Sequence, residues 1–177
     1  MGVFRLTDVS NTERESKQYW DERVSKDWSQ PMHGLFAQYE DDRILRMDAR
    51  NWTILRSLLQ PRNPPWQRVL ECACGYGRYA SEMTTLCDEY IGIDLADLNI
   101  VEARRLNEGT QRASFFVADM ARFDPGVKFD LIFMVAAWSS IEQKSAEIIQ
   151  HLKTRLLKRG GRLVVFEEDL YMVIVKT

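Results

Sequence analysis

One short stretch constrains the fold of this chain more than any other: residues 69–78, with the sequence VLECACGYGR. An apolar run that ends with the acidic residue Glu71 is followed by Gly75 and Gly77, and a segment with helical character begins after them. Glycine adopts left-handed backbone conformations at little cost and lets a ligand approach the backbone closely. The stretch therefore predicts a strand, a tight glycine turn and a helix N-terminus, an arrangement that can cradle a nucleotide.

The acid in front of the turn decides between two kinds of ligand. The spacing Gly75-x-Gly77-x-x-Ala80 also fits the fingerprint of dinucleotide-binding proteins. However, Glu71 would repel an anionic pyrophosphate at the turn unless its side chain pointed away. S-adenosylmethionine has no phosphate, and its ammonium and sulfonium groups are favourable partners for a carboxylate. The pattern favours S-adenosylmethionine, with dinucleotide binding as the alternative.

The chain alternates between two kinds of segment after this motif. Five short apolar segments bounded by turn residues have the character of strands, at residues 68–73, 90–94, 114–118, 129–135 and 161–167. Helical patterns lie between them at residues 78–87, 98–108 and 141–157, and Gly160-Gly161 is expected to end the last helix as a left-handed cap. This alternation predicts βαβ units and a mainly parallel sheet.

The motif VLECACGYGR resembles the first motif of class I S-adenosylmethionine-dependent methyltransferases. The resemblance covers about residues 66–167. It implies an α/β fold with the Rossmann-like sheet of that family, and S-adenosyl-L-methionine as cofactor. We expect residues 66–177 to form the cofactor-binding domain.

Residues 1–65 are expected to form an N-terminal helical lid segment and a linker. A helical period over the later part of residues 13–59 supports this, and Pro61, Pro64 and Pro65 are expected to break that helix. Tyr19 and Arg46 are similar to residues in the lid helices of small-molecule methyltransferases, where a Tyr and an Arg hold the methionine carboxylate. A guanidinium fork matches a carboxylate, although arginines on helix surfaces are common.

The remaining cofactor residues are expected at the ends of the predicted strands. Asp94 closes the second strand, where an acid can accept hydrogen bonds from both ribose hydroxyls. The resemblance implies that Asp119 accepts from the adenine amine and that the backbone of Met120 meets the ring. An acid at a strand end can also be a simple turn former. The predicted cofactor-binding residues are Tyr19, Arg46, Glu71, Ala73, Gly75, Gly77, Asp94, Leu95, Asp119, Met120 and Val135.

No catalytic base stands out in the sequence. Many relatives carry a polar residue after the fourth strand, where this chain has Ala136 and Ala137. The candidates are His33 and Glu167, with Glu168 beside it, and Trp138, which could stack on a flat or cationic substrate or simply pack under the following helix. No metal site is expected, because the cysteines lack the spacing of zinc ligands.

The part of the chain after residue 167 is short for this family. The usual sheet has seven strands, and residues 168–177 cannot hold a helix and two strands. The fold is therefore expected to be truncated after strand five, with residues 170–175 able to add a single strand. An apolar edge there would favour a homodimer or a partner that completes the sheet. A truncated gene product is the third alternative.

Composition limits the function further. A net charge of −2 gives no basic excess for binding nucleic acid. Three cysteines without paired spacing fit a reducing cytoplasm, and no apolar stretch has the length of a signal peptide or a membrane span. The sequence thus predicts a cytoplasmic methyltransferase acting on a small-molecule O, N or C nucleophile. The alternatives are a non-catalytic cofactor-binding or partner-dependent module and a nucleic-acid or protein methyltransferase.

Overall fold

The computed structural model describes residues 17–22, 25, 42–59, 65–167 and 170–176, with the side chains of 42–48, 139–140 and 170–171 outside the description. Residues 17–22 are helical. The strands are β1 (Trp66–Cys72), β2 (Cys87–Asp94), β3 (Ala113–Val117), β4 (Phe129–Val135), β5 (Leu157–Glu167) and β6 (Leu170–Val175). The α-helices are α2 (Asp42–Leu59), α3 (Ala80–Met83), α4 (Asp97–Leu106), α5 (Trp138–Ile141) and α6 (Ser145–His151). A 3-10 turn, η2 (Glu142–Lys144), precedes α6, and a π-helical turn, η3 (Leu152–Leu156), follows it.

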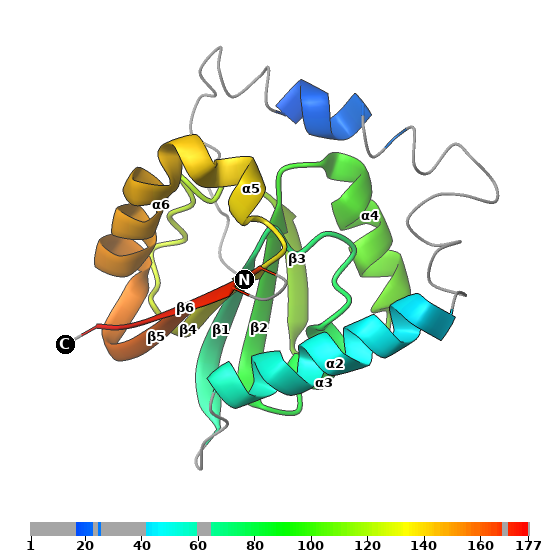
Figure 1. Cartoon of the computed structure of the whole chain (residues 1–177), viewed down its shortest axis with the longest axis horizontal. Helices are drawn as coiled ribbons and strands as arrows, with labels where there is room; N and C mark the ends of the chain where they lie inside the picture. Colours follow the sequence, from blue (N-terminus) through cyan, green and yellow to red (C-terminus); the bar gives the residue numbers. More distant parts are fainter. Residues whose placement is uncertain (1–16, 23–24, 26–41, 60–64, 168–169, 177) are drawn as a thin grey trace.

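The six strands form one sheet in the order β3-β2-β1-β4-β5-β6 (Figure 1). Strands β1 to β5 are parallel to one another, and β6 is antiparallel to β5. The predicted Rossmann-like α/β fold is confirmed. The order places β1 between β2 and β4, so that Glu71 pairs with Gly92 on one side and Phe133 on the other.

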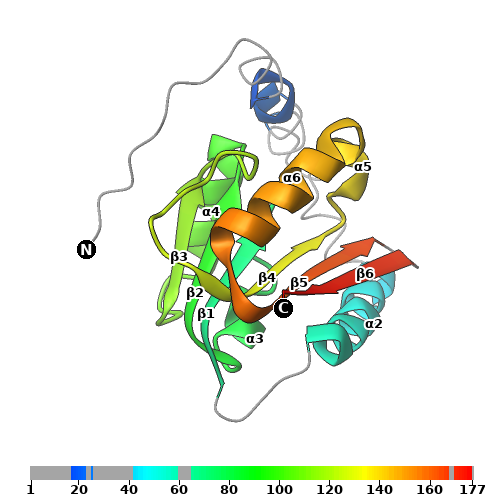
Figure 2. The same cartoon turned by 90° about the vertical axis from the view of Figure 1, so that its left-hand side faces the viewer.

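Apolar side chains cover both faces of this sheet, as parallel strands require. Along β4, Leu131 and Phe133 enter one core cluster while Ile132 and Met134 enter the other. The first cluster contains buried residues of α2, α3 and α4, and the second contains buried residues of α6 and η3. Figure 2 shows α2 and α6 on opposite sides of the sheet.

Two of the predicted helices are shorter than expected or divided. The helix expected over 78–87 is limited to α3, because the chain from Cys87 onward is drawn into the sheet, where Cys87 pairs with Trp66 of β1. The helix expected over 141–157 is divided into η2, α6 and η3, and it ends one residue early because Leu157 already pairs with Phe129.

Gly160 does not cap that helix. It has φ +74 and lies inside β5, where the register with β4 shifts between the pairs Phe129–Leu157 and Leu131–Arg162. The amide of Gly160 donates to the carbonyl of Lys176, 2.7 Å away. The glycine therefore lies at an irregularity in β5 and pairs with the residue that follows β6, rather than ending a helix.

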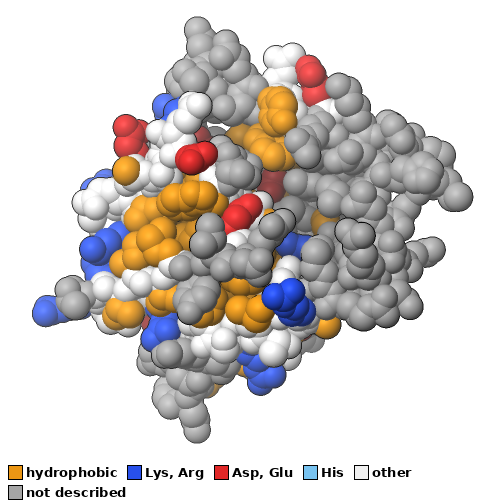
Figure 3. Space-filling model, in the orientation of Figure 1, with side chains coloured by type: hydrophobic (Ala, Val, Ile, Leu, Met, Phe, Trp, Pro, Cys, Tyr) orange, Lys and Arg blue, Asp and Glu red, His pale blue; other side chains and the backbone are white. Residues whose placement is uncertain are grey.

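The single strand that residues 170–175 were expected to add is present as β6, which forms a hairpin with β5. Met172, Val173 and Ile174 are half-buried on β6, whereas Val175 is 51% exposed. Figure 3 shows hydrophobic side chains gathered on the face of the molecule that includes this region. The homodimer or completing partner expected at this edge stays a prediction.

The N-terminal segment is described in part. The apolar residues Leu55 and Leu59 of α2 are fully buried in the same core as the sheet, which confirms the helical period at its C-terminal half. The remainder of residues 1–41 apart from 17–22 and 25, and prolines 61 and 64, lie outside the described residues. Within the described part of the chain, no helix combines the length and apolar character needed to cross a bilayer.

Candidate functional site

The glycine turn after β1 uses its two glycines for different purposes. Gly75 has φ +54, and a Cβ added there would meet nothing within 4 Å. Gly77 has φ +72, and a Cβ there would lie 2.6 Å from the Phe115 ring and 2.9 Å from Asn107 Nδ2. Gly77 thus permits tight packing behind the turn. Gly75 leaves an open space in front of it, as close approach of a ligand to the backbone requires.

Two residues without glycine's freedom also have left-handed conformations at this edge. Ala73 follows β1 with φ +55, and Ala136 follows β4 with φ +53. Their strands are neighbours, since Cys72 pairs with Met134. Such conformations are costly for alanine and concentrate at functional sites. The carboxyl edge of β1 and β4 therefore carries backbone strain on two neighbouring strands.

The carboxylate of Asp94 joins the ends of β1 and β2. Its Oδ2 accepts from the Gly75 amide at 2.9 Å, and its Oδ1 accepts from the Ala96 amide at 2.9 Å and from Asn99 Nδ2 at 3.1 Å. Each carboxylate oxygen can accept two hydrogen bonds, so Oδ2 retains a free lone-pair direction among the described residues. Asp94 fixes the glycine turn and still has capacity for a ligand hydroxyl. Leu95, the next residue, is half-buried.

Glu71 is buried, with 2% of its surface exposed. Its carboxyl group accepts a hydrogen bond from the hydroxyl of Tyr90 on β2. Burial raises the pKa of Glu71 to about 8, while the Tyr90 hydrogen bond and the charge of Arg78 act in the opposite direction. The carboxyl group is thus held mainly in its neutral form at neutral pH. Its predicted pairing with a cationic cofactor group stays a prediction.

The residues after β3 form a turn. Asp119 Oδ1 accepts from the Ala121 amide at 2.8 Å, and the Asp119 carbonyl accepts from the amides of Arg122 and Phe123. Asp119 therefore has the turn-forming role that was its alternative interpretation, and its side chain remains half-buried. Met120 is half-buried against the second core cluster. Both follow β3 at the same edge of the sheet as Asp94.

The ends of β4 and β5 carry the remaining candidates. Val135 is 7% exposed. Glu167 Oε2 accepts a hydrogen bond from the Trp138 amide at 2.9 Å, so the carboxylate caps the start of α5. Trp138 packs against the second core cluster and remains half-buried, which supports its packing role. Glu167 and Trp138 are thus brought together by the sheet.

The described N-terminal helix lies beyond the same edge. Figures 1 and 2 both show residues 17–22 (blue) above the end of the molecule at which α4 begins. Tyr19 is 54% exposed and contacts Trp20 edge to face, with ring centroids 5.3 Å apart. Arg46 lies in α2, but its side chain is outside the described residues, as are His33 and Glu168.

Three residues near the site were not singled out from the sequence. Tyr90 donates a hydrogen bond to Glu71, and Lys17 donates one to the loop after β2. Asn107 Nδ2 donates to the carbonyls of Ala103, Gly77 and Tyr76 at 2.9, 3.3 and 3.5 Å. Only Asn107 has a sequence signal, because Asn is a common residue just after a helix C-terminus. The others depend on pairings between distant segments.

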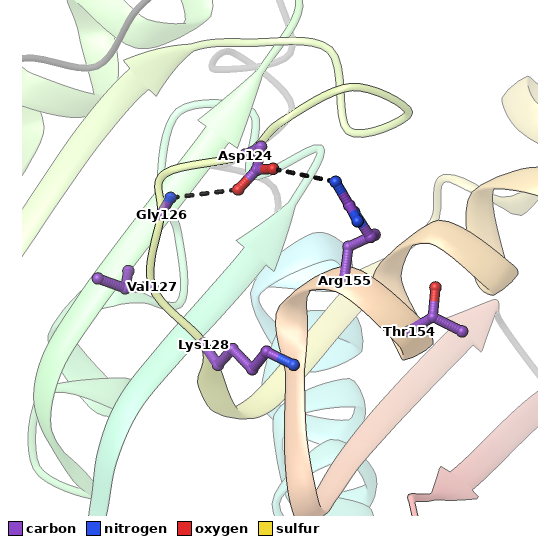
Figure 4. Close-up of a pocket in the computed structure, with 6 residues that line it drawn as sticks. All are labelled: Asp124, Gly126, Val127, Lys128, Thr154 and Arg155. Carbon is purple, nitrogen blue, oxygen red and sulfur yellow. Dashed lines mark hydrogen bonds and ion pairs between the residues drawn. The ribbon is translucent and has the colours of Figure 1, made fainter.

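A surface cavity of about 230 Å³ lies elsewhere, between the connection from β3 to β4 and the turn η3 (Figure 4). Lys128 and Arg155 border it, and Arg155 forms a loose ion pair of 3.9 Å with Asp124. The lining residues precede β4 and β5, so the cavity is at the amino end of these strands. It is therefore separate from the carboxyl edge that carries Gly75 and Asp94.

Comparison with protein families matches residues 69–161 to a methyltransferase domain. Among solved structures, the chain is similar to the N-methyltransferase NodS from Bradyrhizobium japonicum WM9 in complex with S-adenosyl-L-homocysteine, at 19% identity and a TM-score of 0.66 over 82% of this chain and 71% of that one. It is similar to DhpI in its complex with SAH, at 19% identity and a TM-score of 0.63 over 93% and 79% of the two chains. The YcgJ protein from Bacillus subtilis gives 20% identity and a TM-score of 0.59 over 66% and 50%. The comparison with curated protein sequences gave no match.

The structural matches agree with the fold, and the family match spans more than half of the chain, including the glycine turn, Asp94 and Asp119. The resemblance indicated by VLECACGYGR is confirmed, and S-adenosylmethionine is the cofactor of that family. The chain belongs to the class I S-adenosylmethionine-dependent methyltransferases.

Proposed function

We propose that this methyltransferase holds S-adenosylmethionine across the carboxyl ends of β1, β2 and β3 and transfers its methyl group to a small-molecule O, N or C nucleophile. The strongest support for this cofactor position comes from the contact between Gly75 and Asp94. The open side of Gly75 lies beside the carboxylate of Asp94, to which the Gly75 amide is bonded at 2.9 Å. A backbone without a side chain and an acceptor for hydroxyls are thus adjacent.

The surrounding residues fit the chemistry of this cofactor. Asp94 would accept from the ribose hydroxyls, and the neighbouring Leu95 would line the nucleoside. Asp119 and Met120 would meet the adenine at the next strand end. Glu71, Ala73 and Gly75 would lie near the methionine portion, with Tyr19 and Arg46 supplied by the N-terminal segment. The left-handed backbone at Ala73 supports this assignment, because it bends the chain directly after β1.

The cofactor, when bound, supplies an electrophilic methyl carbon on its sulfonium. The chain would accelerate transfer mainly by aligning the acceptor with that carbon in a site from which water is excluded. Glu167 is the side chain we propose for accepting the proton that the acceptor loses. Its Oε2 accepts a hydrogen bond from the Trp138 amide. This contact fixes the orientation of the carboxylate, and Oε1 would accept the proton.

Two observations bear on the choice of acceptor. The chain has a net charge of −2, which does not favour the phosphate backbone of a nucleic acid. NodS, which shares the fold, is an N-methyltransferase, so amines belong in the first set of acceptors to be examined. Trp138 beside Glu167 would offer an aromatic face to a flat or cationic acceptor.

The first test is calorimetric titration of the purified chain with S-adenosylmethionine and S-adenosylhomocysteine. We expect micromolar binding that Asp94→Ala weakens at least about tenfold, or about 1.4 kcal/mol. Asp88→Ala changes an exposed acid at the opposite end of β2 and should bind like the wild type. A folded wild-type chain that binds neither compound would overturn the proposal.

A cofactor-binding module without turnover is the second candidate. Ala136 and Ala137 follow β4, and methyl side chains cannot move a proton. Transfer of labelled methyl groups to a panel of amines, hydroxyls and activated carbons distinguishes the two. Tight cofactor binding with no transfer to any acceptor would favour the module, whereas transfer that requires Glu167 would favour the enzyme.

A further inference from the structure

The helix at residues 17–22 is attached to the loop that leads from β2 into α4. Lys17 Nζ donates to the Leu95 carbonyl at 3.3 Å and forms an ion pair of 3.0 Å with Asp97. On the same helix, Asp21 Oδ1 accepts from the Asp97 amide at 3.1 Å. Two residues of the helix therefore hold three separate groups of the loop.

Lys17 is the centre of this attachment. Its ammonium group lies between two carboxylates, Asp97 and Asp21, and the second pair is 2.7 Å long. Burial lowers the pKa of Lys17, but the hydrogen bonds and charges of Asp21 and Asp97 outweigh it and raise the pKa overall. The lysine side chain is 29% exposed and Asp97 60% exposed, so the pairs are open to screening by salt.

The same loop follows directly on Asp94, the last residue of β2. The Asp94 carboxylate bonds the Ala96 amide and the Gly75 amide, so residues 94–97 are held from within the sheet on one side. The helix holds them from the other side through the Leu95 carbonyl and Asp97. Lys17 and Asp94 thus contact adjacent residues of one short segment, Leu95 and Asp97 from the helix and Ala96 from the sheet.

We propose that Lys17 is a positioning residue for the cofactor site, which it keeps in its binding geometry by tying helix 17–22 to residues 95–97. The proposal rests on the proposed function, because it assigns Asp94 to the cofactor. Lys17 itself need not touch the cofactor. It fixes the loop that directly follows Asp94, the residue assigned to the cofactor, and it holds Tyr19 and Trp20 beyond the carboxyl edge.

The helix offers a matched control. Gln18 Nε2 donates to Glu22 Oε1 at 2.9 Å in an exposed pair with the same i, i+4 spacing. Removing this pair changes the helix by a similar amount but leaves the loop after β2 untouched. Gln18→Ala should therefore bind the cofactor with wild-type affinity.

The test compares Lys17→Met, Lys17→Arg and Gln18→Ala in calorimetric titrations with S-adenosylhomocysteine at low and high salt. Lys17→Met keeps the aliphatic stem and removes the charge, so we expect the Kd to rise about fivefold at low salt. Lys17→Arg should restore most of the affinity. High salt should reduce the difference in Kd between the wild type and Lys17→Met, because screening weakens the ion pairs of Lys17.

A second measurement does not depend on the cofactor. Amide hydrogen exchange at Asp97 should be faster in Lys17→Met than in the wild type and Gln18→Ala. The Asp97 amide donates to Asp21 on the helix that Lys17 holds in place. If the wild type binds S-adenosylhomocysteine but Lys17→Met binds equally well at both salt concentrations, the positioning role is wrong. If the wild type does not bind S-adenosylhomocysteine, the proposed function is wrong. In that case, equal hydrogen exchange at Asp97 in the wild type and in Lys17→Met would show separately that Lys17 does not tie the helix to residues 95–97.

Discussion

Tyr90 donates a hydrogen bond to the carboxyl group of Glu71 between the two neighbouring strands β1 and β2, with both side chains buried. The pair lies next to the glycine turn, within reach of the charges of Arg78 and Asp94. Burial raises the pKa of Glu71 to about 8. In an unfolded chain the same carboxyl group titrates near its ordinary value of 4.5.

This difference makes stability depend on pH. Between about pH 4.5 and 8 the unfolded chain has lost the Glu71 proton and the folded chain still holds it, so the contribution of this group to stability falls as pH rises. The slope is on the order of 1 kcal/mol per pH unit. We expect Glu71→Gln to remove this slope in urea unfolding curves recorded from pH 5 to 8. Glu82→Gln, at an exposed carboxyl on α3, should retain it; equal slopes for wild type and Glu71→Gln would contradict the assignment.

Cofactor binding should release protons through the same residue. The ammonium and sulfonium groups of S-adenosylmethionine would favour the ionised form of Glu71 and lower its pKa from about 8. The binding enthalpy at pH 7 should therefore differ between buffers with different ionisation enthalpies. In Glu71→Gln the difference should vanish. A wild-type enthalpy that is independent of the buffer would show that the cofactor charges do not reach Glu71.

The two glycines of the turn should respond differently to alanine. Gly75→Ala places a Cβ in open space at φ +54, so the free energy of unfolding should fall by only about 1–2 kcal/mol. The new methyl group occupies the ligand side, and cofactor affinity should fall at least about tenfold. Gly77→Ala would meet Phe115 and Asn107 within 3 Å and should lose about 2–4 kcal/mol of stability. Urea unfolding measures the loss of stability, and calorimetry measures the cofactor affinity. A larger loss of stability in Gly75→Ala than in Gly77→Ala would contradict these separate roles.

Glu167 can be separated into a structural and a catalytic role by two substitutions. Glu167→Gln keeps an oxygen that can accept from the Trp138 amide, so stability should be unchanged within about 0.5 kcal/mol, whereas Glu167→Ala should lose about 1 kcal/mol. A general base would be lost in both variants, so kcat should fall about 100-fold or more with little change in cofactor affinity. If Glu167→Gln retained full turnover once an acceptor is known, Glu167 would only cap α5.

The strands could be predicted from the sequence because each is an apolar run bounded by turn residues. All five predicted strands exist, and β4 has the predicted ends, Phe129 and Val135. The helix ends were less predictable, since pairing of Cys87 with Trp66 and of Leu157 with Phe129 overrode the helical period. These pairings join segments far apart in the chain, and a local pattern carries no signal for them.

The site shows the same division. Gly75, Asp94 and Asp119 could be placed from the sequence, because residues that follow neighbouring parallel strands meet at one edge. The burial of Glu71 against Tyr90 could not, since it depends on which strand lies beside β1. Nor could the contact between Lys17 and Asp97, although the pair of Lys17 with Asp21 has the ordinary helical spacing.

The position of β1 between β2 and β4 also determines when the turn can become rigid during synthesis. A ribosome releases residues 66–117 before β4, and this stretch holds β1, β2 and β3 together with Asp94 and with Gly75 in the turn after β1. One edge of β1 stays unpaired until β4 follows, because Val69 pairs with Leu131 on that side. Closing such a long loop is a slow step in folding. We therefore expect a nascent chain to contain Gly75 and Asp94, two of the proposed cofactor residues, before β4 is available to pair with the free edge of β1.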